Sequence, residues 1–210
     1  MGFFDRWRDE HEDDVDLDSF DEEAYARQHF EEDPRAGWLG GVLPVQFVLA
    51  RSEDAAVVVT HLAVFPEGFE FTLRAKVRRP KRDSSVPRGM PLDTFPHPGS
   101  YRGELPDHVL RFGIKFSDGA RVSNVDRDPH WPDATEPRHG MSTSSGGGSN
   151  VEYSWDYWAW PAPTEGDLTM VCEWPAYDIA ETSQVIRGGD FASALERSER
   201  IWPPARRPLG

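Results

Sequence analysis

The segment SSGGGSNVEYSWDYWAWPAPTEGDLTMVCEWPA, residues 144–176, decides the fold that this sequence predicts. A run of serine and glycine leads into a stretch rich in tyrosine and tryptophan, a proline-rich turn follows, and a second apolar stretch ends at Trp174. Four of the eight tryptophans and the single cysteine of the chain lie here. The segment therefore supplies much of the predicted core, and it carries no catalytic signature.

Side chains of the aromatic stretch alternate between two faces, as in a β-strand. One face is predicted to be core and holds Val151, Tyr153, Trp155, Tyr157 and Ala159. The other face begins with polar residues and continues with Trp158 and Trp160. These two indoles indicate either a surface that stacks on a sugar or grips a peptide, or rings covered by the C-terminal helix or the N-terminal arm. Tyr157, Trp158 and Trp160 are therefore the candidate ligand-binding residues.

Shorter alternating or apolar stretches predict the remaining strands. They cover residues 45–49, 56–65, 69–77, 110–116, 121–125, 168–174 and 183–186. Tight turns predict that 56–65 pairs with 69–77 and 110–116 with 121–125, and the Pro-rich turn predicts that 168–174 pairs with the aromatic strand. Because little helical pattern separates the strands, an antiparallel arrangement is favoured over a parallel sheet. The predicted fold is mainly β, a single antiparallel β-sandwich, either immunoglobulin-like or jelly-roll-like.

Three regions follow from this pattern. Residues 1–36 are acidic with scattered aromatics and predict a flexible, partly disordered N-terminal arm, with one short helix around 22–30. Residues 37–187 form the predicted β-sandwich domain. Residues 188–210 form a short C-terminal helix, with Asp190 as its predicted N-cap, and a tail.

Charge and composition exclude several classes of function. The net charge of −14 argues against nucleic-acid binding and against docking on anionic lipid, because both need a basic surface. The chain contains neither a secretory signal pattern nor an apolar run long enough to span a membrane. The single cysteine excludes an intramolecular disulfide. We therefore expect a cytoplasmic protein without a transmembrane segment.

One acidic connection could hold a metal ion. Asp126, Asp128, His130 and His139 lie in the predicted surface loop 126–150, with oxygen and imidazole donors that suit Ca²⁺ or Zn²⁺. The EF-hand glycine and the HExxH pattern are both missing, so the alternative is a solvated acidic loop. No cofactor is predicted. His61 and Cys172 are interpreted as core residues, and the glycine-rich residues 144–150 as a flexible connector rather than a phosphate loop.

The sequence resembles a group of uncharacterised actinobacterial β-rich proteins. The residues that carry the resemblance are the glycine-rich run, the aromatic strand ending in Trp-Pro, the segment CEWPAYDIAET, and the patterns VTHLAVFPEGFEFTLRAKVR and LRFGIKFSDGARVSN. Together they cover roughly residues 43–182. The resemblance implies no activity, ligand or site residue.

Three functional hypotheses remain open at this point. The first is a non-enzymatic module that binds a protein or a small ligand through the aromatic strand. The second is a metal-dependent hydrolase that uses His130, His139 and the neighbouring carboxylates. The third is an assembly or scaffold protein whose N-terminal arm engages a protein partner. No set of residues in the sequence points to a catalytic nucleophile.

Overall fold

The computed structural model describes Phe30 and residues 33–79, 105–126, 139–149 and 151–202. The chain forms two compact units, Met1–Ala36 and Gly37–Gly210. In the first unit, Arg35 forms an ion pair with Asp33, with 2.9 Å between Nε of the arginine and Oδ1 of the aspartate. Residues 1–29 and 31–32 of the predicted N-terminal arm lie outside the described residues.

The larger sheet of the second unit is antiparallel and contains six strands, with spatial order β2-β4-β5-β9-β8 and with β3 also pairing β4. These strands are β2 (Gly41–Leu43), β3 (Phe47–Arg51), β4 (Ala55–Val64), β5 (Phe69–Val77), β8 (Gly140–Gly148) and β9 (Glu152–Trp160). The predicted hairpin of 56–65 with 69–77 is confirmed as the pair β4–β5.

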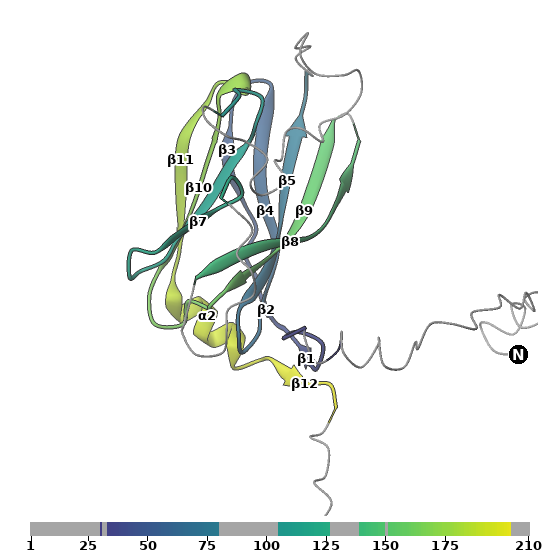
Figure 1. Ribbon diagram of the computed structural model, residues 1–210, viewed down its shortest axis with the longest axis vertical. Coiled ribbons are helices and arrows are strands. Elements are labelled where there is room, and N and C mark those ends of the chain that lie inside the picture. Colours follow the sequence, from purple (N-terminus) through teal and green to yellow (C-terminus); the bar gives the residue numbers. More distant parts are fainter. Residues whose placement is uncertain (1–29, 31–32, 80–104, 127–138, 150, 203–210) are drawn as a thin grey trace, which may run out of the picture. The chain divides into compact units, whose positions relative to one another are not determined.

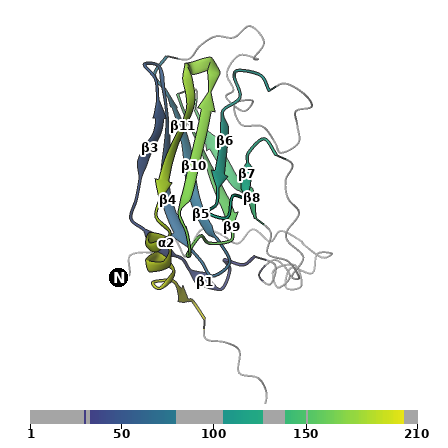
Figure 2. The same ribbon diagram turned by 90° about the vertical axis from the view of Figure 1, so that its left-hand side faces the viewer.

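A second antiparallel sheet has the order β11-β10-β6-β7. Its strands are β6 (Arg111–Lys115), β7 (Arg121–Ser123), β10 (Leu168–Trp174) and β11 (Ile179–Ile186). Figures 1 and 2 show the two sheets as facing layers, with the short helix α2 (Gly188–Leu195) near one end. The prediction of a mainly β, antiparallel, sandwich-like fold is confirmed at that level of description. The described residues also contain three small elements, β1 (Trp38–Leu39), β12 (Glu199–Arg200) and the 3₁₀ turn η3 (Pro175–Tyr177).

The core lies between the two sheets. Alternate residues of β5 point into it, and Phe71 stacks on Tyr157 of β9 with ring centroids 5.3 Å apart. Phe112 of the facing sheet completes this contact at 5.5 Å from Phe71. Cys172 is buried here, and burial raises the pKa of its thiol to about 12. The interpretation of Cys172 as a small core residue is therefore confirmed.

The pairing predicted between the aromatic strand and residues 168–174 is wrong. β9 lies between β5 and β8, whereas β10 pairs with β6 and β11 in the other sheet. The connection from β9 to β10 contains Pro161 and Pro163, which have no backbone N–H to donate to a ladder. The chain therefore crosses between layers at this point instead of folding into a hairpin.

Helix α2 begins earlier than predicted. Its N-cap residue is Arg187, and Asp190, the predicted cap, lies in the first turn. The backbone N–H of Gly188 donates instead to Oδ1 of Asp167 at 3.1 Å. Phe191 packs edge-on against Phe69 of β5, with ring centroids 5.1 Å apart, so the helix belongs to the sandwich core. Within the described residues, no helix is both long and apolar enough to cross a bilayer.

Candidate functional site: the edge formed by β8 and β9

The serine- and glycine-rich residues, predicted to be a flexible connector, form a strand. Gly140–Gly148 pairs antiparallel with β9 along its whole length, with one register shift between Thr143 and Ser145. Serine side chains fasten the two strands together: Ser144 Oγ donates to the carbonyl of Asp156 at 3.1 Å. The prediction failed because glycine and serine are poor strand formers, and partners across the sheet hold these residues extended.

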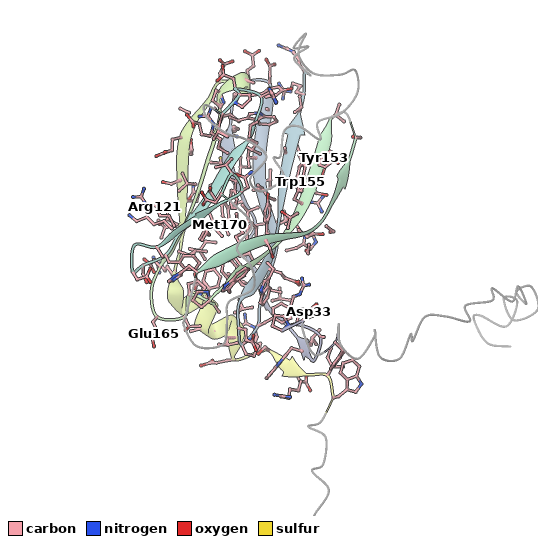
Figure 3. The ribbon with its side chains drawn as sticks, in the orientation of Figure 1. Asp33, Arg121, Tyr153, Trp155, Glu165 and Met170 are labelled. Atoms are coloured by element: carbon pink, nitrogen blue, oxygen red, sulfur yellow. The ribbon has the colours of Figure 1, made fainter. Side chains whose placement is uncertain are left out.

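Glycines of β8 lie opposite aromatic residues of β9. Gly140 pairs with Trp160, Gly146 with Trp155 and Gly148 with Tyr153. A Cβ on Gly146 would lie 2.8 Å from Cδ1 of Trp155, and one on Gly148 would lie 2.6 Å from Cα of Tyr153. Figure 3 labels Tyr153 and Trp155 on β9, beside β8. These glycines thus make room for bulky neighbours on the adjacent strand.

Gly147 is different, because a Cβ there would meet nothing within 4 Å. This position therefore accepts a side chain, whereas its two glycine neighbours do not. The sequence carried a usable signal: Gly146 and Gly148 repeat with the same period of two as Tyr153 and Trp155. Recognising it required knowing that the two segments pair.

Backbone groups on the outer edge of β8 have no strand partner among the described residues. The N–H of Ser149 donates to the carbonyl of Glu152 at 2.6 Å, which makes this a hydrogen-bonded pair. Such pairs alternate along an antiparallel ladder with pairs whose backbone groups point away from the partner strand. Counting from Ser149, the N–H and C=O of Gly146 and Gly148 point away from β9. Among the described strands, none pairs with β8 on that side.

A carboxylate lies on the outer face of the sheet next to this edge. Asp156 Oδ1 accepts a hydrogen bond from Thr72 Oγ1 and Oδ2 accepts one from Ser145 Oγ, both at 2.6 Å. Partial burial opposes its ionisation, but the two hydroxyl donors, with the nearby charges of His61 and Arg74, outweigh burial and lower the pKa of Asp156. Asp156 therefore remains a carboxylate at neutral pH.

His61 is not the core residue that the sequence predicted. It is exposed at a bulge of β4, where the register with β5 shifts between Thr60 and Ala63. Its φ of 54° lies in the left-handed region, and its Nδ1 lies 3.0 Å from Thr60 Oγ1. The extra residue of a bulge turns a side chain out of the strand's alternation, so periodicity alone could not place His61.

Two cationic side chains on this face share one carboxylate, that of Glu152. Glu152 of β9 accepts from Arg74 Nη1 at 3.1 Å and from Lys76 Nζ at 3.0 Å. The hydrogen bond from Lys76 is the largest cause that lowers the pKa of Glu152. Asp156, by contrast, contacts hydroxyl groups and no cationic nitrogen among the described residues. Asp156 is therefore the carboxylate beside β8 that has capacity for a cation.

The three candidate ligand-binding residues of the aromatic strand are buried. Tyr157 is 3% exposed and lies in the main core, where burial raises the pKa of its hydroxyl although Thr143 and Asn124 hydrogen-bond to it. Trp158 and Trp160 are 3% and 5% exposed and form a second cluster with Phe65, against which Trp38 and Ala63 pack. The two indoles are therefore covered, and the described hydrophobic residues that pack on them come from β1, β4 and the turn after β4 rather than from the predicted C-terminal helix or N-terminal arm.

The candidate metal ligands are not assembled among the described residues. Asp126 Oδ2 accepts the backbone N–H of Ser123 at 2.8 Å, and His139 Nε2 lies 3.1 Å from Asp118 Oδ2. The His139 ring also packs on Phe116, with centroids 4.4 Å apart. Asp128 and His130 lie outside the described residues. Within the described part of the chain, no group of three or more His, Cys, Asp or Glu residues could hold a metal ion.

The lowered pKa of Asp156 predicts a pH dependence of stability. A group whose pKa is depressed by folding contributes stability above its unfolded pKa and loses that contribution as pH falls through its folded pKa. As pH falls below 3.8, the ordinary pKa of aspartate, we expect the unfolding free energy of Asp156→Asn to decrease less steeply than that of the parent protein. Urea titrations at a series of pH values measure this. If the unfolding free energies of the two proteins fell with the same slope at acid pH, the prediction would be contradicted.

Comparison with known proteins adds no function: no protein-family model, curated protein or solved structure matches this chain.

Proposed function

We propose that this protein is a non-enzymatic binding module that takes an extended segment of another protein onto β8 as an additional strand. The observation that carries the proposal is the edge itself. Gly146 and Gly148 direct their N–H and C=O groups away from β9, and residues 143–148 are exposed. Strand addition uses this kind of backbone edge, with main-chain hydrogen bonds supplying the affinity.

The composition of β8 supports this use. Proteins usually protect edge strands with charges, prolines or a covering element, because a free edge pairs with other chains. The exposed residues of β8 carry neither a charge nor a proline, and they include three consecutive glycines, Gly146, Gly147 and Gly148. Their small side chains leave the backbone accessible to a second strand.

The edge is also held in place before a partner arrives. Ser145 donates a hydrogen bond to Asp156, and the carbonyl of Gly147 accepts one from Ser154 Oγ at 3.3 Å. The rings of Tyr153 and Trp155 lie against the glycines. The two rings contact each other with centroids 4.0 Å apart. A strand that is already ordered loses less conformational entropy on binding, which favours affinity.

Amide spectra of the ¹⁵N-labelled protein test the proposal. The probe is a peptide of alternating threonine and glutamine with the nine-residue length of β8. We expect saturable shifts, and slower hydrogen exchange, centred on the amides of Gly146 and Gly148. A matched peptide with proline at every second position has too few N–H groups to pair and should produce neither effect. Equal responses to both peptides, or no response in residues 144–149, would refute strand addition.

A further inference from the structure

Resting on strand addition at β8, we infer that the segment it accepts is cationic, with a lysine or arginine side chain that binds Asp156 on the outer face of the sheet. A backbone edge alone accepts any extended segment, whereas the position of Asp156, its contacts and the charges around it select a cationic one.

Asp156 lies one strand in from the edge, directly opposite Ser145. Neighbouring strands are about 4.8 Å apart, so a strand added to β8 would place its backbone roughly 10 Å from that of Asp156. A lysine or arginine pointing to the same face spans most of this gap, and the carboxylate spans the remainder. Ser145 between them is small enough to let the side chain pass.

The carboxylate retains binding capacity. Each oxygen of Asp156 accepts one hydrogen bond from a hydroxyl group, and an ionised carboxylate offers about four acceptor positions. A cation at this site would therefore add bonds without displacing Thr72 or Ser145. Charge-assisted bonds of this kind are about twice as strong as bonds between neutral groups.

Before a cation binds, the formal charges of these groups sum to zero, because Arg74 and Lys76 share Glu152 and Asp156 is the second carboxylate. His61 is the remaining basic side chain near Asp156. Beyond the site, the net charge of −14 attracts a cationic segment over long distances and repels a second copy of this chain. Charge therefore favours a basic peptide over self-association through β8.

Three alternating peptides test the inference, each with threonine at every second position and lysine, glutamine or glutamate between. Fluorescence anisotropy measures affinity, and the amide shifts of residues 144–149 confirm the location. We expect the lysine peptide to bind at least tenfold more tightly than the glutamine peptide, with the glutamate peptide weakest. If the lysine and glutamine peptides bind β8 equally, the cationic partner is refuted while strand addition stands. If none shifts these amides, strand addition itself fails.

Two sets of variants separate Asp156 from the overall charge. Asp156→Asn keeps the size and polarity of the side chain, and it should reduce binding of the lysine peptide to the level of the glutamine peptide. Gly147→Lys and Gly147→Glu are a matched pair at an open position. Gly147→Lys should weaken binding of the lysine peptide several-fold, and Gly147→Glu should strengthen it several-fold. A lysine preference that survives Asp156→Asn would assign selectivity to net charge and overturn the inference. The inference would also be overturned if the protein formed concentration-dependent dimers through β8 and Gly147→Lys abolished them.

Discussion

Replacing Trp158 with alanine should lower the free energy of unfolding by about 3–5 kcal/mol, the usual cost of removing a buried large aromatic ring. Trp158 is 3% exposed, and it packs edge-on against Phe65 with ring centroids 5.6 Å apart. The backbone also approaches the indole closely, since a Cβ on Gly68 would lie 2.6 Å from its Cζ2. A cavity left here cannot close without moving β4 and β9. Urea denaturation measures the loss.

Trp202→Ala is the matched control, because that indole is 55% exposed in the described residues. We expect it to cost under about 1 kcal/mol, as surface substitutions usually do. The comparison also decides what the second aromatic cluster is for. If Trp158→Ala left stability unchanged and reduced peptide binding, the rings would be a binding surface that opens in solution. A stability loss with the same peptide affinity per folded molecule would identify them as core.

The sequence predicted elements whose signal lies within one strand. β5 follows from strict alternation between Phe69 and Val77, because one face meets the core and the other meets solvent. The same rule separated Tyr153 and Trp155 from Asp156. Trp158 and Trp160 were singled out because they interrupt the polar face, and in the structure they lie with Phe65 in a second apolar cluster.

The features that the sequence did not reveal depend on which strands are neighbours. Gly146 and Gly148 are extended because rings of β9 lie against them, and no local preference of glycine favours a strand. His61 leaves the core because β4 gains a residue relative to β5. Asp156 becomes a candidate site only when Ser145 and Thr72 are brought beside it from two other strands. Such relations need the sheet order, which the sequence does not state.

Gly148→Ala should separate the end of β8 from β9 and abolish peptide binding. An alanine Cβ there would lie 2.6 Å from Cα of Tyr153, closer than real side chains tolerate, and neighbouring backbone cannot yield as a flexible side chain can. We expect a loss of about 1–3 kcal/mol, the range for overpacked sites, with the largest gain in hydrogen exchange at residues 144–149. Thermal unfolding and exchange rates measure the two effects.

Gly147→Ala is the control that separates strain from the loss of a glycine. Its Cβ meets nothing within 4 Å, so the change should keep β8 paired, and stability should stay within about 0.5 kcal/mol of the parent protein. Because β8 remains in place, the alternating peptides should bind Gly147→Ala as they bind the parent. If both substitutions reduced stability and peptide binding equally, the edge would need the flexibility of glycine itself. The proposal that strand addition uses an ordered edge would then be refuted. If only Gly148→Ala reduced stability and peptide binding, Gly148 would be required for packing against the rings of β9. This packing would then be what keeps β8 ordered for a partner strand.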